Sequence, residues 1–120
     1  MKKKTLVIGA SEKPERYSNK AIKALRNHNH QVVALAPRKG QVEDVQFLTD
    51  RKEIEDLDTV TMYVGPKNQA AYVEYILGLN PKRVIFNPGT ENAEFANKLE
   101  EKGIEAEFAC TLVLLSLGEY

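Results

Sequence analysis

The chain alternates short apolar runs with longer segments in which apolar residues recur every three or four positions. The short runs end at glycine, proline or polar residues, as strands buried on both faces do, and the longer segments have helical spacing. We expect strands at residues 5–9, 31–35, 59–64, 83–86 and 104–109. We expect helices at residues 18–29, 66–80 and 91–102, the first of them capped by Ser18. Repeated strand–helix alternation predicts a three-layer, doubly wound (Rossmann-like) α/β domain over residues 1–120, with five parallel strands.

Two stretches fit this alternation less regularly. Residues 42–48 read as a short extension at the edge of the sheet. Asp50 with Glu53 three residues later has the spacing of a capping box, which predicts a short helix before residue 58. The apolar run Leu112–Leu117 predicts either a closing helix over the sheet or a contact between subunits.

The loops that follow the predicted strands are the candidate functional region. Ligands of doubly wound sheets lie beyond the carboxyl ends of the strands, near the point where the strand order reverses. Gly9 ends the first strand, and a glycine there lets the backbone approach a phosphate closely. Ser11, Ser18 and Asn19 offer hydroxyl and amide groups to the same ligand, and Arg16 offers a positive charge.

The end of the second strand narrows the ligand class. The first loop lacks the second and third glycines of the G-x-G-x-x-G dinucleotide fingerprint. An NAD site expects an acidic residue after the second strand, whereas this chain has Arg38 and Lys39. Two cations suit a phosphorylated ribose, as in NADP or in the 3′-phosphoadenosine of coenzyme A. A solvated basic turn is the structural alternative.

Composition excludes several classes of protein. The 120 residues carry 17 lysines and arginines against 17 aspartates and glutamates, so the basic excess of a duplex DNA binder is absent and we expect no nucleic-acid partner. The apolar run after Met1 is too short for a secretory leader or a membrane span. We therefore expect a cytoplasmic protein with no membrane partner.

Few residues have the arrangement that catalysis needs. Cys110 follows the last predicted strand at the ligand edge, where its thiol can serve as a nucleophile, exchange with the thiol of bound CoA, or simply pack. His28 and His30 fall in a turn at the opposite end, where we expect them to face solvent without a metal. The sequence shows no triad, metal cluster or P-loop, so we name no catalytic residue and favour a protein that is not an enzyme.

Three short motifs, in order along the chain, resemble those of the small stand-alone CoA-binding domain proteins. They are Gly9-Ala10-Ser11 with Pro14-Glu15-Arg16 and Ser18-Asn19, then Ala36-Pro37-Arg38, then Asn87-Pro88-Gly89-Thr90-Glu91-Asn92. The resemblance extends over residues 4–115 and is shared with the N-terminal domain of the succinyl-CoA synthetase alpha subunit. By position, Lys39 matches a lysine that helps to hold the nucleotide end of CoA in that synthetase.

The resemblance implies coenzyme A or an acyl-CoA as the ligand, and a task for each loop. Gly9, Ala10 and Ser11 would cradle the pyrophosphate, while Pro37, Arg38 and Lys39, after Ala36, would meet the adenosine and its 3′-phosphate. Val64, Gly65 and Pro66 would border the adenine or the pantetheine arm. Asn87, Pro88, Gly89 and Glu91 would line the far side, and Cys110 would lie near the thiol. Many relatives carry an asparagine where this chain has Ala36.

Three functions remain open at this point. The first is a non-catalytic CoA-binding module that senses or buffers CoA, or docks on an acyl-CoA enzyme. The second is a small NADP-binding oxidoreductase. The third is a ligand-free protein-interaction domain, with Leu112–Leu117 as its contact surface. The neighbouring leucines Leu114 and Leu115 also suit a homodimer.

Overall fold

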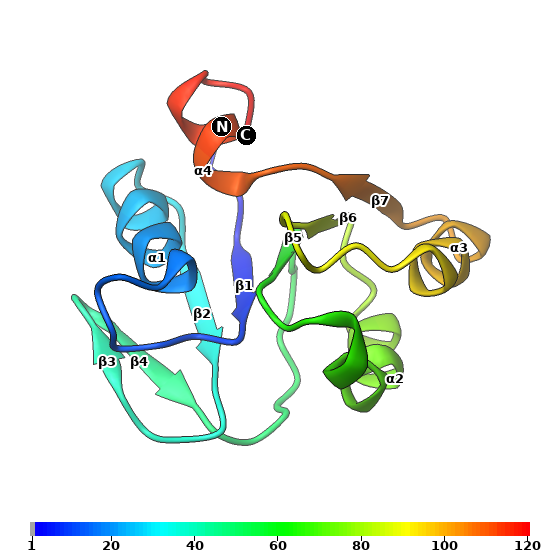
Figure 1. The fold of residues 1–120 in the computed structure, drawn as a ribbon, viewed down its shortest axis with the longest axis horizontal. Helices are drawn as coiled ribbons and strands as arrows, with labels where there is room; N and C mark the ends of the chain where they lie inside the picture. Colours follow the sequence, from blue (N-terminus) through cyan, green and yellow to red (C-terminus); the bar gives the residue numbers. More distant parts are fainter. Residues whose placement is uncertain (1) are drawn as a thin grey trace.

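The computed structural model describes residues 2–120 as one seven-stranded sheet with helices on both faces, which confirms the predicted fold class (Figure 1). The strands are β1 (Thr5–Ile8), β2 (Val32–Leu35), β3 (Gln41–Val42), β4 (Val45–Leu48), β5 (Thr59–Met62), β6 (Arg83–Phe86) and β7 (Glu105–Phe108). The helices are α1 (Tyr17–Asn27), the 3₁₀ turn η1 (Pro66–Asn68), α2 (Ala70–Leu79), α3 (Ala93–Glu101) and α4 (Thr111–Ser116). Within residues 2–120, no helix has the length and apolar character needed to cross a membrane.

Three interior strands of the sheet explain the continuous apolar runs of the sequence. Every residue of β1, β5 and β6 is buried, because helices cover the sheet on both sides. On one face Leu6 and Ile8 pack in the cluster that includes α2 and α3, and on the other Val7 packs with α1 and α4. The strand order β3-β4-β2-β1-β5-β6-β7 places the reversal between β1 and β5. The loops after these two strands therefore frame the expected ligand position.

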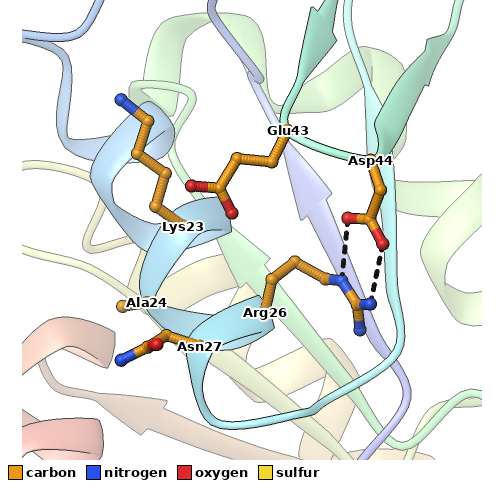
Figure 2. A pocket seen from close by; sticks show the side chains of 6 residues that line it. All are labelled: Lys23, Ala24, Arg26, Asn27, Glu43 and Asp44. Atoms are coloured by element: carbon orange, nitrogen blue, oxygen red, sulfur yellow. Dashed lines mark hydrogen bonds and ion pairs between the residues drawn. The ribbon is translucent and has the colours of Figure 1, made fainter.

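The edge beyond β2 differs from the five-stranded prediction. Residues 41–48 form a hairpin whose second strand, β4, pairs in parallel with β2, while β3 pairs antiparallel with β4. Arg26 of α1 fixes this hairpin, because its Nε and Nη2 donate to the two carboxylate oxygens of Asp44 at 2.9 and 2.7 Å (Figure 2). These hydrogen bonds hold the pKa of Asp44 below its ordinary value. The hairpin turn uses Glu43 at φ +52°.

The short helix expected from Asp50 is wrong. Residues 49–58 run irregularly, with Ile54 and Leu57 buried in the core. The Tyr75 hydroxyl donates to the Lys52 carbonyl at 2.6 Å and so ties the segment to α2. The segment buries these two apolar side chains and makes its backbone contact without forming a helix. The first turn of a helix is costly to nucleate, so a short helix is not favoured here.

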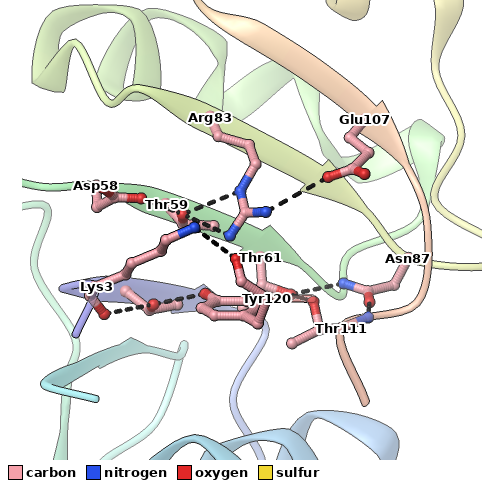
Figure 3. Close-up of polar contacts among 10 residues, drawn as sticks. Lys3, Asp58, Thr59, Thr61, Arg83, Asn87, Glu107, Thr111 and Tyr120 are labelled. Carbon is pink, nitrogen blue, oxygen red and sulfur yellow. Dashed lines mark hydrogen bonds and ion pairs between the residues drawn. The ribbon is translucent and has the colours of Figure 1, made fainter. Parts of the chain in front are cut away.

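The amino-terminal edge of the sheet is closed by the last residue described, Tyr120 (Figure 3). Its hydroxyl lies 2.6 Å from Thr5 Oγ1, and the Arg83 guanidinium lies 4.6 Å from its ring centroid. Lys3 Nζ donates to the Tyr120 carbonyl at 2.5 Å. Contacts from both ends of the chain thus meet beneath the sheet.

His30 belongs to the same cluster, so the expectation that it faces solvent is wrong. Its side chain is buried, packs edge-on against Tyr120 with ring centroids 4.9 Å apart, and accepts a hydrogen bond from the Lys3 amide at Nδ1. Sequence position alone did not reveal the aromatic ring that covers it. His28, two residues earlier, is exposed as expected.

Candidate ligand-binding site

A pocket of about 790 Å³ opens at the carboxyl edge of the sheet, where the strand order reverses. Its walls are the loop after β1 on one side and the loops after β5 and β6 on the other. Of the residues expected at the site, those lining it are Gly9, Ser11, Arg16, Ser18, Pro37, Arg38, Gly65, Pro88 and Gly89. The structure adds Lys13, Glu15, Tyr17, Tyr63 and Thr90 to this lining.

A smaller hollow of about 220 Å³ adjoins this pocket between the loop after β1 and the turn after β2. Both share Ser11, Lys13, Pro37 and Arg38, so they form one trough along the sheet edge. The hollow is completed by Ala10, Glu12, Ala36, Lys39 and Phe47. An elongated ligand fits such a trough better than a compact one.

Gly9 makes the sharp turn out of β1. Its φ is +92°, and a Cβ at this position would lie 3.0 Å from Val64 Cγ2 and 3.1 Å from the Tyr63 carbonyl carbon. The amides of Gly9 and Ala10 both donate to the Leu35 carbonyl at 3.1 Å. These two residues therefore fix the path of the loop, and their amides are already occupied by β2.

The first turn of α1 points its amides at the pocket. The helix begins at Tyr17, with Arg16 in the cap position at φ −76° and ψ 140°, so Ser18 is not the cap that the sequence predicted. The Arg16 side chain makes no capping hydrogen bond, and the first turn contains no acidic residue. Unsatisfied amides and the helix dipole favour an anion at this end. Lys13, Arg16 and Arg38 line the same space and add positive charge.

Asn19 supports the first loop from behind. It is buried, and its Nδ2 donates to the Ser11 carbonyl at 3.0 Å, while its Oδ1 has no hydrogen-bond partner among the described residues. The Ser11 hydroxyl in turn accepts from the Lys13 amide at 3.1 Å. Asn19 thus shapes the loop, and Ser11 lines the pocket.

Asn87 lies buried beneath the loop after β6, and protein groups occupy its side chain. Its Nδ2 donates to Thr61 Oγ1 at 2.7 Å and to the Met62 carbonyl at 2.9 Å, and its Oδ1 accepts from the Thr111 amide at 2.9 Å (Figure 3). Glu91 similarly accepts from the Gly89 amide at 2.9 Å. Both residues hold the loop in shape, beside the residues that line the pocket.

The remaining expected residues lie around the pocket. Val64 packs against the core, and Pro66 faces a separate hollow between α2 and α3. Cys110 is half-buried at the start of α4, outside the lining of the pocket. The structure does not bring these three side chains into the trough.

Tyr63 is the lining residue that sequence reasoning missed most clearly. It follows β5 within an apolar run, a position typical of a packing residue, and its ring does pack against the core. Its hydroxyl is buried, and this burial raises the pKa of Tyr63 well above its ordinary value. The phenol therefore stays protonated near neutral pH. Lys13 and Tyr17 fall inside the loop after the first strand, and Thr90 belongs to the third motif, although none of the three was expected to line the site.

Comparison with known proteins identifies the family. Residues 3–116 match the family described as a CoA binding domain. The chain belongs to this CoA-binding domain family. The uncapped helix and the cations of the trough are consistent with the phosphate groups of such a ligand. No curated protein matched the chain.

Solved structures support the same fold for this CoA-binding domain. One described as an uncharacterized protein is 46% identical, with a TM-score of 0.98 over 100% of this chain and 99% of its own. A hypothetical protein from Pyrococcus horikoshii OT3 is 31% identical, with a TM-score of 0.82 over 93% of this chain and 80% of its own. Cell-free ID.343 from Thermus thermophilus, 24% identical with a TM-score of 0.83, covers 99% of this chain and 91% of its own, and shows the fold alone.

Proposed function

We propose that this domain binds coenzyme A or an acyl-CoA along the trough, as a non-catalytic cytoplasmic module that senses or buffers the cofactor or presents it to an acyl-CoA enzyme. The observation that carries the proposal is the uncapped start of α1, which opens into the pocket beside Lys13, Arg16 and Arg38. Three cations and free helix amides at one point favour a ligand with several phosphates.

The shape of the trough orders the parts of the ligand. The pyrophosphate would lie at the start of α1 and Ser11. The adenosine with its 3′-phosphate would extend toward Arg38 and Lys39, in the smaller hollow. The pantetheine arm would pass between Gly65 and the loop at Gly89, where the lining residues are uncharged.

The lining groups favour binding over proton transfer. Arg16 and Arg38 bring guanidinium groups to the lining, and the buried phenol of Tyr63 stays protonated near neutral pH. Glu12 already accepts a hydrogen bond from the Gln41 amide at 3.0 Å. The two guanidinium groups hold an anionic ligand in place, which supports a sensing, buffering or docking role.

Thermal unfolding with CoA, dephospho-CoA, NADP and NAD tests the proposal. A ligand at one hundred times its dissociation constant stabilises a domain by about 2.7 kcal/mol, which is a measurable shift in Tm. We expect CoA to give the largest shift and dephospho-CoA a smaller one. A larger shift with NADP would favour the oxidoreductase instead. No shift with any of the four would favour a protein-interaction domain with Leu112–Leu117 as its contact.

A further inference from the structure

Gln69, at the start of α2, joins the two loops that form the far wall of the pocket. Its side chain is fully buried. Nε2 donates to the Val64 carbonyl at 2.9 Å and to the Thr90 carbonyl at 2.7 Å, and Oε1 accepts from Asn92 Nδ2 at 3.1 Å. Both amide hydrogens and the amide oxygen are therefore used, one hydrogen toward the loop after β5 and the other two atoms toward the loop after β6.

The buried amide of Gln69 holds neighbouring loops and helix ends together. Burying an amide is unfavourable unless its hydrogen bonds are made, and here the partners are loop carbonyls. Asn92 extends the chain of contacts, because its Oδ1 accepts from the Phe95 amide and caps α3. The loop after β5, the start of α2, the loop after β6 and the start of α3 are thus held as one unit.

The opposite wall is built without Gln69. Residues 12–17 are exposed, and this loop is fixed by the bonds from Asn19 to the Ser11 carbonyl, from the Gln41 amide to Glu12 and from Arg16 N to the Lys13 carbonyl. On the far wall, Gly65 follows the bonded Val64 directly, and the bonded Thr90 itself lines the pocket. Gln69 therefore bridges directly the two segments that carry Gly65 and Thr90.

We infer that Gln69 is a positioning residue that fixes the half of the pocket where the pantetheine arm would lie. The inference rests on the proposed function, which assigns the arm to that half. A wall fixed in advance costs the ligand less ordering on binding, so affinity for the arm depends on Gln69. The adenosine end lies against the other wall and does not depend on it.

Gln69→Met in the full chain tests this inference by calorimetric titration with CoA, 4′-phosphopantetheine and adenosine 3′,5′-bisphosphate. We expect about tenfold weaker binding of CoA and 4′-phosphopantetheine, because the two loop carbonyls lose their shared donor. We expect adenosine 3′,5′-bisphosphate to bind within about twofold of the wild type. Gln31→Met, at an exposed position before β2, is the matched control and should change none of the three.

Asn92→Asp is a second, milder variant. It keeps an oxygen to cap α3 but removes the donor to Gln69 Oε1. The binding of CoA and 4′-phosphopantetheine should therefore weaken by a smaller factor than in Gln69→Met. Asn97→Asp, exposed on the same helix, is its control. Equal losses for all three ligands, or unchanged CoA binding in both variants, would overturn the inference. Wild-type protein that binds neither CoA nor 4′-phosphopantetheine would overturn the proposed function together with it.

Discussion

Two glycines, Gly9 and Gly65, lie where the strand order of the sheet reverses, but their backbone conformations differ. Gly9 has φ +92°, and a Cβ there would press on Val64 and on the Tyr63 backbone. Gly65 has φ −64°, which any residue adopts, and a Cβ there would meet no atom within 4 Å. The fold requires a glycine at the first position only. The bare backbone at Gly65 leaves room in the pocket that it lines.

This contrast predicts that one of two matched substitutions lowers stability and that the other weakens ligand binding. Gly9→Ala should lower the free energy of unfolding by about 1–3 kcal/mol, because the alanine is strained and crowded. Gly65→Ala should change it by less than about 0.5 kcal/mol, yet weaken CoA binding. Urea denaturation and calorimetric titration of both variants measure the two effects. Equal losses of stability would contradict the distinction between these positions.

Residue identity predicted the site only in part. A strand-ending glycine and a pair of cations after β2 are visible in sequence, and Gly9 and Arg38 do line the pocket. Asn87 looked equally suitable, but the sequence does not show that Thr61 and Thr111 occupy its amide. Gln69 gave no signal, because its amide donates to backbone carbonyls, and no residue type in the sequence marks such acceptors.

The elements were predictable where burial is complete on both faces. β1, β5 and β6 are interior strands whose residues are all buried, so their apolar runs are unbroken and their positions matched expectation. The β3–β4 hairpin is half-exposed and depends on its contacts with α1, which a local pattern does not contain. Residues 49–58 carried a capping signal, but long-range hydrogen bonds from Tyr75 to the Lys52 carbonyl and from Lys4 to the Glu55 carbonyl hold the segment in another path.

The turn after β2 leads to a prediction at the scale of this element. Pro37 ends the strand, and Arg38 and Lys39 follow it, exposed beside the smaller hollow. Replacing both cations by alanine should weaken the binding of CoA about tenfold and the binding of dephospho-CoA much less, because only CoA carries the 3′-phosphate. Calorimetric titration of the two ligands measures the difference.

A matched pair of cations provides the control for that experiment. Lys98→Ala with Lys102→Ala removes the same charge from α3, away from the turn after β2. This control should leave the preference for CoA over dephospho-CoA intact. If the Arg38 and Lys39 variant loses both ligands equally, the turn does not read the 3′-phosphate.

Across the whole molecule, the ligand pocket lies at one edge of the sheet, and the contacts that join the chain ends lie at the opposite edge. The carboxyl edge is open and lined by loops, whereas the amino-terminal edge is closed by Tyr120, Arg83, Lys3 and His30. Contacts at the closed edge join the two ends of the chain. Changes there should alter stability without altering the ligand site.

His30 makes this closed edge sensitive to pH. Burial lowers the pKa of His30, and the nearby positive charges of Lys2, His28 and Lys3 lower it further. Protonation would also abolish the Nδ1 acceptor for the Lys3 amide. Because the folded pKa lies below the unfolded value of about 6.5, the unfolded chain takes up the proton first as pH falls. Neutral His30 therefore makes its full contribution to the free energy of unfolding above the unfolded pKa of about 6.5, and this contribution decreases as the pH falls below it.

His30→Asn should therefore reduce the dependence of stability on pH. Asparagine can supply an oxygen acceptor at a similar place but does not titrate, so the fall in the free energy of unfolding between pH 7.5 and 5.5 should become shallower. Urea denaturation at the two pH values measures this, with the exposed His28→Asn as the matched variant. An unchanged slope in His30→Asn would show that the buried imidazole does not control the transition. CoA affinity at pH 7.5 should be the same in both variants, because the histidines lie at the edge opposite the trough.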